Sequence, residues 1–336
     1  MKLMTALLAL GLASSTLADA PGMAELSVDA AHHEHALSGI VMYPTEVTSG
    51  LQSIGGNPVF KGVNVVPDAD PLDGRYPLIL LSHGMGGTVR SLAWLAQDLA
   101  ARGAIVASVN HPNSTWGDFE IARATEHWTR AQDLRAVLDH MLAHEELAEL
   151  IDTDRIMAAG FSYGGWTALS LAGVQGNLDG YKAHCAMFPT QSAHCSDMRD
   201  AGVELSQFSA ELWNAPYADA RVTHVAAIDP GLVWGIAEID LQIPTENLRL
   251  ISLGDGEDRL FATDFDASGF ADRVPGAAIT RIEPATHFSA MPRCTAIGAD
   301  ILADEGEDPV CTDPEGAVRA GIHQEILDVL AGDLGL

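Results

Sequence analysis

The segment at residues 155–165 constrains the fold of this chain more than any other stretch. It reads RIMAAGFSYGG: an apolar run, then G-F-S-Y-G, then the start of a helix-like run. A G-x-S-x-G sequence between a buried strand and a helix is typical of a nucleophile elbow, in which the serine occupies a strained turn. Gly160 and Gly164 would remove clashes in that turn, and Gly165 would let the helix approach the strand. The bare pattern also occurs by chance, but its flanks favour Ser162 as a nucleophile.

The net charge limits the partners of the chain. Aspartate and glutamate number 46 against 18 lysines and arginines, so the formal net charge is −28 at pH 7. Such a surface disfavours nucleic acid and anionic membranes as partners. We expect neither a nucleic-acid partner nor a stable membrane anchor.

The N-terminus has the features of a secretory signal peptide. Met1-Lys2 is a short basic region, residues 3–13 are apolar, and Ala18 and Ala20 suit cleavage. A membrane anchor is the alternative, but the apolar run is too short to span a bilayer. We therefore expect a signal peptide over residues 1–20, one domain over residues 21–336, and secretion or a periplasmic location.

The cysteine count agrees with export. An even number of cysteines in an exported chain predicts disulfides. Three pairings are possible, and local pairing is favoured because each bond would close one short irregular segment. Each bond would add about 2–3 kcal/mol by restricting the unfolded chain. Free buried thiols are the alternative, and zinc is disfavoured because no C-x-x-C pair is present. The local pairs are Cys185–Cys195 and Cys294–Cys311.

A histidine cluster near the N-terminus is a candidate metal site. His32, His33 and His35 lie within four residues of one another. Imidazoles are common metal ligands, but a solvated N-terminal segment is the commoner explanation of such a cluster. We therefore expect no metal.

Alternating apolar strands and amphipathic helices predict a parallel sheet covered on both faces. Residues 175–220 interrupt this alternation and are too long for a simple connection, so we expect an excursion over the active-site edge. The expected strands are 39–45, 60–66, 78–81, 104–109, 155–159, 222–228, 248–253 and 278–282, and the expected helices are 88–102, 129–144, 166–173 and 315–330.

A nucleophilic serine needs an adjacent base. After such an elbow the chain order is serine, acid, histidine. His287 fits best because it follows strand 278–282 after a short loop. His323 lies on the last helix and His224 at the start of a strand, so both fit less well.

Three aspartates are candidates for the acid that would orient this histidine. Asp258 and Asp255 lie in the turn after strand 248–253, and Asp229 ends the strand before it. Each also has an ordinary explanation as a turn residue. We rank Asp258 first, Asp229 second and Asp255 last.

Two backbone amides are expected to form an oxyanion hole. One belongs to Tyr163, directly after the nucleophile, and the other to the glycine-rich loop at residues 83–87, where Met85 is the expected donor. That loop lacks the G-x-G-x-x-G pattern and the lysine of phosphate-binding loops, which argues against a phosphate site.

Several of these segments occur together in a known family. Residues 160–165, residues 82–87, Asn110-His111-Pro112, Thr286-His287-Phe288, the four cysteines and the run Cys311-Thr-Asp-Pro-Glu-Gly316 resemble the bacterial "predicted dienelactone hydrolase" group, which is related to platelet-activating-factor acetylhydrolase. The likeness covers roughly residues 78–330. It implies an α/β-hydrolase fold, with a mostly parallel central sheet and helices on both faces, acting on esters without metal or cofactor.

The resemblance also bears on the site. It supports Ser162 and His287, and Met85 and Tyr163 as amide donors. The acetylhydrolase pattern places the acid where Asp229 stands, whereas the bacterial relatives often use a position like Asp258. Dienelactone hydrolase proper has a cysteine nucleophile, so the group's name is not taken literally.

We therefore predict a serine hydrolase that cleaves a small-molecule carboxylic ester through an acyl-enzyme intermediate, with no cofactor. The alternatives are an amidase, peptidase or lactonase on the same triad, or a non-catalytic binding protein on this scaffold. Several aromatic residues either line an apolar pocket or belong to the core: Phe188, Phe208, Trp213, Tyr217 and Trp234.

Overall fold

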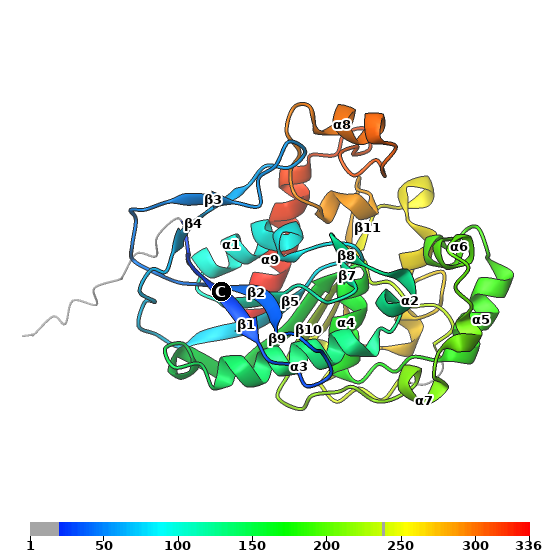
Figure 1. The fold of residues 1–336 in the computed structure, drawn as a ribbon, viewed down its shortest axis with the longest axis horizontal. Helices are drawn as coiled ribbons and strands as arrows, with labels where there is room; N and C mark the ends of the chain where they lie inside the picture. The colour runs from blue at the N-terminus through cyan, green and yellow to red at the C-terminus, as the bar shows by residue number, and fades with distance from the viewer. Residues whose placement is uncertain (1–19, 237–238) are drawn as a thin grey trace, which may run out of the picture.

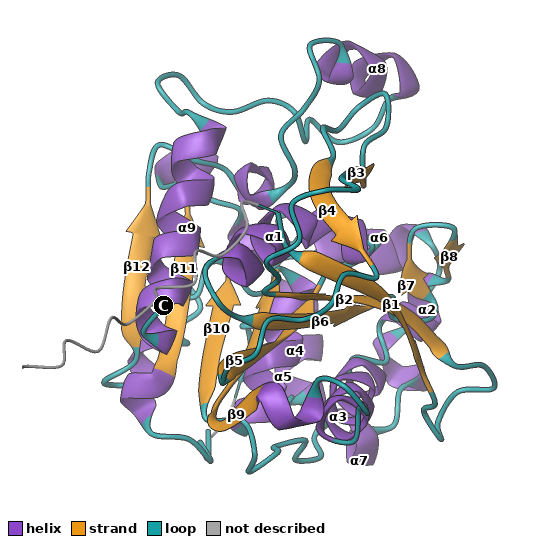
Figure 2. Cartoon of the chain, turned by 90° about the vertical axis from the view of Figure 1, so that its left-hand side faces the viewer, coloured by secondary structure: helices purple, strands orange, loops and turns teal. Residues whose placement is uncertain are grey.

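The computed structural model describes residues 20–236 and 239–336; the expected signal peptide lies outside them except for Ala20. A ten-stranded sheet runs in the order β12-β11-β10-β9-β5-β6-β2-β1-β4-β3 (Figure 2), and β7 and β8 form a separate two-stranded sheet. The strands are β1 Gly22–Val28, β2 Leu37–Tyr43, β3 Gln52–Ile54, β4 Val63–Pro67, β5 Tyr76–Ser82, β6 Ile105–Val109, β7 Ser114–Thr115, β8 Asp118–Phe119, β9 Ile151–Phe161, β10 His224–Ile228, β11 Leu248–Leu253 and β12 Ala278–Ile282.

The prediction of a mostly parallel sheet is confirmed. The six strands from β6 to β12 in the sheet order pair in parallel, while β2 pairs antiparallel with β6 and β1 antiparallel with β2. The observed β11 and β12 coincide with the predicted strands, whereas β1 and β3 were not predicted. Strand β5 is an apolar run because it is buried on both faces: Leu78 and Leu80 belong to one core cluster, and Ile79 to the other.

Helices cover both faces of the sheet (Figure 1). Helices α1 (Ala93–Ala101) and α9 (Arg319–Leu334) pack on one face, and α3 (Trp128–Leu142) and α4 (Tyr163–Ala172) on the other. Among the described residues, no helix combines the length and apolarity needed to cross a bilayer. The shorter helices are α2 Ile121–Ala124, α5 Leu178–Met187, α6 Ala193–Asp200, α7 Ala210–Trp213 and α8 Gly298–Glu305.

The segment at residues 175–220 is more regular than expected. It forms α5, α6 and α7, which lie together at one end of the molecule (Figure 1), and the disulfide Cys185–Cys195 joins α5 to α6. Tyr181 and Trp213 from this segment share a core cluster with residues of α3 and α4. The five aromatic residues divide accordingly: Phe208, Trp213 and Tyr217 are buried core residues, whereas Phe188 and Trp234 are half-buried.

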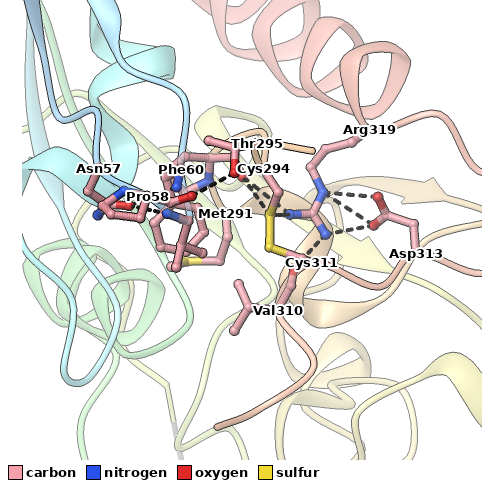
Figure 3. The surroundings of a disulfide bond; sticks show 12 residues. Asn57, Pro58, Phe60, Met291, Cys294, Thr295, Val310, Cys311, Asp313 and Arg319 are labelled. Carbon is pink, nitrogen blue, oxygen red and sulfur yellow. Dashed lines mark hydrogen bonds and ion pairs between the residues drawn. A yellow bond between two sulfur atoms is a disulfide. The ribbon is translucent and has the colours of Figure 1, made fainter. Parts of the chain in front are cut away.

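The second disulfide, Cys294–Cys311, joins the two ends of the segment that carries α8 (Figure 3). Cys294 forms an isolated antiparallel β-bridge with Phe60 through the backbone. The Arg319 guanidinium donates a hydrogen bond to the Val310 carbonyl and forms an ion pair with Asp313. These contacts join the segment after β12 to α9 and to the loop before β4.

Removing this disulfide is expected to destabilise the protein. The bond spans 17 residues, and the double substitution Cys294→Ala/Cys311→Ala frees that loop in the unfolded chain, which should lower the free energy of unfolding by about 3 kcal/mol. Urea denaturation under oxidising conditions measures this change. An unchanged midpoint and slope would show that the bond does not stabilise the fold.

Candidate active site

Ser162 lies in a tight turn between β9 and α4. Its backbone has φ 57° and ψ −118°, a conformation that costs energy for a residue with a Cβ. The Ser162 amide donates to the Ile228 carbonyl at 2.8 Å, and the Gly231 amide donates to the Ser162 carbonyl at 2.9 Å. Hydrogen bonds from the end of β10 and the loop beyond it therefore hold the serine at the carboxyl edge of the sheet.

The two glycines beside Ser162 are required by close packing. A Cβ on Gly164 would lie closer than 3.0 Å to the Ser82 carbonyl oxygen, and a Cβ on Gly160 equally close to the Gly164 carbonyl oxygen. The neighbouring atoms are backbone, so they cannot yield by rotating a side chain. The turn therefore accepts only glycine at both positions.

Gly164→Ala is expected to destabilise the protein by about 1–3 kcal/mol, because the new methyl group overpacks this turn. The rate of ester hydrolysis should also fall. The added methyl group would displace the Ser82 carbonyl, and Ser82 directly precedes the glycine-rich loop. Gly332→Ala is the matched control: the site on α9 has open space, and we expect a gain of about 0.5–1 kcal/mol. Equal thermal stability of the two variants would contradict this account of the elbow.

His287 connects Ser162 to a buried carboxylate. Its Nε2 lies 3.1 Å from the Ser162 Oγ, and its Nδ1 lies 2.6 Å from the Asp229 Oδ2. His287 opens a short 3-10 helix, His287–Ala290, whose first turn is closed by reciprocal bonds between Thr286 and Ser289. The structure thus brings Ser162, His287 and Asp229 into one hydrogen-bonded line.

Asp229 is fully buried at the end of β10 and has several partners besides His287. The Leu253 amide and the Thr263 hydroxyl donate to its two oxygens, and Arg259 forms an ion pair with it. Burial alone would raise the pKa of Asp229. The His287 hydrogen bond and the Arg259 charge outweigh it, so the pKa lies below its ordinary value. The carboxylate therefore stays ionised next to His287.

Among the three candidate acids, only Asp229 contacts His287 within the described residues. Asp258 and Asp255 are exposed in the turn after β11, and among the described residues neither forms a hydrogen bond with His287. Strand β10 lies next to β9 in the sheet, so its end is nearer to Ser162 than the turn after β11. Arg259, in the turn after β11, points inward and forms an ion pair with Asp229.

The glycine-rich loop lies against the serine. An ideal Cβ on Gly84 would be 3.4 Å from the Ser162 Cβ. Within residues 20–236 and 239–336, neither the Met85 amide nor the Tyr163 amide donates to a protein acceptor. Both predicted donors are thus available on the segments that flank Ser162.

A buried arginine that was not predicted from the sequence supports this loop. Arg130 on α3 donates to the His83 carbonyl, to the Ser114 hydroxyl at 2.6 Å and to the Thr167 hydroxyl at 3.2 Å. Its guanidinium lies 4.9 Å from the centre of the Tyr163 ring. Burial lowers the pKa of Arg130 to about 10. Arg130 therefore fastens α3 and α4 to the start of the glycine-rich loop.

Two further buried histidines, His83 and His323, have structural roles. Burial, with the Arg130 charge, places the pKa of His83 well below its ordinary value, and its Nδ1 donates to the Gly84 carbonyl at 2.7 Å. His323, the weaker candidate base, stacks on Trp94 and contacts the carbonyls of Ser289 and Met291. It therefore supports the segment that carries His287.

Comparison with known proteins supports a hydrolase fold. A model of the prolyl oligopeptidase family matches residues 90–214, a range that contains Ser162 but neither Asp229 nor His287. Cutinase est1 of Thermobifida alba is 33% identical over 105 residues, 31% of this chain and 32% of that protein. Lipase 1 of Moraxella sp. (strain TA144) is 37% identical over 82 residues, 24% of this chain and 23% of that protein. These matches span a third or less of the relatives' lengths.

The similarity of the whole fold is broader. The structure of a ferulic acid esterase from Streptomyces cinnamoneus superposes with a TM-score of 0.59 at 19% identity, covering 94% of this chain and 88% of that one. The chain therefore has an α/β-hydrolase fold.

Proposed function

We propose that this chain is an exported serine hydrolase that cleaves a carboxylic ester through an acyl-enzyme intermediate. The observation that carries the proposal is the hydrogen-bonded line from Ser162 through His287 to Asp229. Cutinases and a lipase among the partial relatives favour an ester over other acyl compounds. The two disulfides suit an oxidising location.

The geometry suggests a sequence of proton transfers. Ser162 Oγ attacks the ester carbonyl while His287 Nε2 accepts its proton. Asp229 holds the Nδ1 proton and stabilises the imidazolium. The amides of Met85 and Tyr163 stabilise the tetrahedral oxyanion, and each such donor contributes about 3–4 kcal/mol in comparable sites. The protonated His287 protonates the leaving alcohol, and water, deprotonated by His287, then releases the acid.

An aromatic cluster that includes a residue close in sequence to Asp229 favours an apolar substrate group. Trp234 follows the Asp229 turn closely in sequence and packs on Phe261 and Phe188, with ring centres 4.5 and 5.6 Å away. All three side chains are half-buried, and exposed aromatic surface of this kind binds apolar ligands. We place the apolar part of the ester on this aromatic cluster.

We also propose that the chain belongs to the dienelactone hydrolase-like and acetylhydrolase-like group.

A substrate panel tests the function. Purified protein is assayed with p-nitrophenyl esters of increasing acyl length, methyl ferulate, a lactone and a prolyl p-nitroanilide, with Ser162→Ala as the control for background hydrolysis. We expect turnover of at least one ester to exceed that of the anilide. A preference for the anilide would support a peptidase, in line with the family match over residues 90–214. No turnover of any substrate above the Ser162→Ala background would support a non-catalytic protein.

A further inference from the structure

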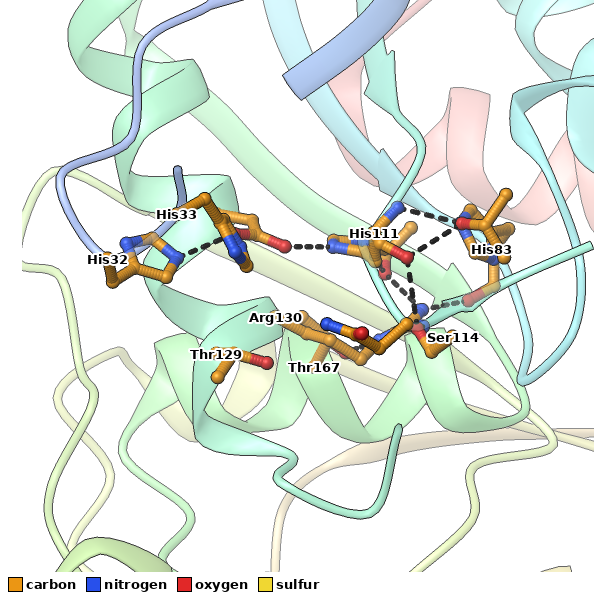
Figure 4. A network of polar contacts seen from close by, with 12 residues as sticks. His32, His33, His83, His111, Ser114, Thr129, Arg130 and Thr167 are labelled. Carbon is orange, nitrogen blue, oxygen red and sulfur yellow. Dashed lines mark hydrogen bonds and ion pairs between the residues drawn. The ribbon is translucent and has the colours of Figure 1, made fainter. Parts of the chain in front are cut away.

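Two histidines near the N-terminus contact one buried carboxylate, that of Asp133. None of these three residues belongs to the proposed triad. His32 and His33 lie in the loop between β1 and β2, and their Nε2 atoms are 2.6 and 2.7 Å from the Asp133 Oδ1. The three donor atoms lie within 4.8 Å of one another. Figure 4 shows the two labelled rings next to each other on one side of His111, with Arg130 below them in this view.

Asp133 is held rigidly for such a role. It lies on α3 with its side chain 1% exposed, and its second oxygen accepts a hydrogen bond from the His111 Nδ1 at 2.7 Å. His111 Nε2 in turn contacts the Ser82 hydroxyl at 2.9 Å. One carboxylate oxygen is therefore fixed by outer partners, while the other faces two imidazole nitrogens, as is common around protein-bound metals.

The cluster also has an access route. A surface cavity of about 600 Å³ is lined by His32 and His33 and by the polar side chains of Glu34, His35 and Asp118. Water and a metal ion can reach the two imidazoles through it, which a closed hydrogen-bonded cluster in the core would not allow. The cavity also leaves room for water as a further ligand.

We propose that His32, His33 and Asp133 form a binding site for a divalent transition metal of the zinc class. Two imidazole nitrogens and one carboxylate oxygen are a donor set that zinc accepts, with water completing a tetrahedron. Tetrahedral zinc bonds would separate the donor atoms by roughly 3.4 Å. The present contacts are shorter, so both rings must move outward by less than about 1 Å, and both lie on a surface loop.

The metal would have a structural role. It would fasten the loop between β1 and β2 to α3, and through Asp133, His111 and Ser82 it would adjoin the polar network beneath the glycine-rich loop. No step of the proposed ester hydrolysis passes through it. The site and the proposed activity are thus independent claims.

Zinc titration of the full chain tests the site. Protein without a polyhistidine tag is treated with a chelator, and zinc binding is measured by calorimetry and by equilibrium dialysis with metal analysis. We compare the natural sequence with His32→Ala/His33→Ala and with His35→Ala, a histidine of the same loop and cavity that does not contact Asp133. The Ser162→Ala chain is expected to bind zinc like the natural one, so failure of the proposed activity would not affect this result.

The expected result is one zinc ion per natural chain and per His35→Ala chain, with binding about 100-fold weaker or more in the double variant. Zinc at about 100 times its Kd should raise Tm by about 4 °C in the natural chain and leave the double variant unchanged. Circular dichroism without zinc checks that all variants are folded. Absence of stoichiometric binding, or equal binding by the double variant, would show that the cluster is held by hydrogen bonds alone.

Discussion

Replacing Ser162 by alanine is expected to lower kcat/KM for ester hydrolysis by roughly 10⁴–10⁶-fold while leaving Tm within about 1 °C. The Oγ is the only atom lost, and its hydrogen bond in the structure is with His287 Nε2. Alanine keeps the Cβ, so the strain of the positive φ is present in both proteins. Michaelis–Menten kinetics with a p-nitrophenyl ester and a thermal melt measure the two quantities.

This result distinguishes chemistry from folding. A large loss of activity with an unchanged melt would assign the loss to the missing hydroxyl. A variant that keeps more than about a tenth of the natural activity would require another nucleophile.

Asp229→Asn is expected to lower kcat by roughly 10³–10⁴-fold, because an amide cannot hold His287 in the reactive tautomer or stabilise its charged form. It should also lower the free energy of unfolding by about 3–5 kcal/mol. The second effect follows from Arg259, whose side chain is only 8% exposed and would lose its charged partner. Kinetics and urea denaturation measure the two losses separately.

Asp258→Asn is the matched control for this substitution. Asp258 is exposed. We therefore expect the Asp258→Asn variant to keep kcat within about twofold of the natural protein and its free energy of unfolding within about 0.5 kcal/mol. The double variant Asp229→Asn/Arg259→Met removes both buried charges, and it should recover stability without recovering activity. A larger loss of activity in Asp258→Asn than in Asp229→Asn would restore our original ranking of the acids.

The sequence could not single out Asp229, because the choice of acid depends on which strands are neighbours. The chain order places both Asp229 and Asp258 before His287 at the ends of successive strands, so both satisfy the expected order. Only the sheet order shows that β10 lies between β9 and β11. By contrast, the elbow is a local feature, and its glycines and flanking apolar runs predict it from short-range sterics alone.

The polar residues of α3 were missed for a different reason. The amphipathic pattern predicted a helix over residues 129–144 but assigned no role to Arg130 or Asp133. They are in fact 1% exposed, like the apolar Leu134 and Val137 beside them. Their spacing places them on the buried stripe of the helix, so charged residues in that register were an available signal of a buried network.

The excursion was only partly predictable. Its length and cysteine pair predicted a segment outside the regular alternation, but its three short helices carry few apolar residues of helical period. They are fixed by packing of Tyr181 and Trp213 against α3 and α4 and by the Cys185–Cys195 bond. Long-range packing of this kind leaves little trace in the local pattern.

Covalent labelling tests the central claim most directly. The natural protein is treated with a fluorophosphonate probe, which reacts with activated serine hydroxyls, and the modified peptide is located by mass spectrometry. We predict one adduct per chain, on Ser162, with labelling abolished in Ser162→Ala and reduced at least about 100-fold in Asp229→Asn. An adduct on another serine, or no adduct on folded protein that hydrolyses esters, would contradict the assignment of Ser162 as the nucleophile.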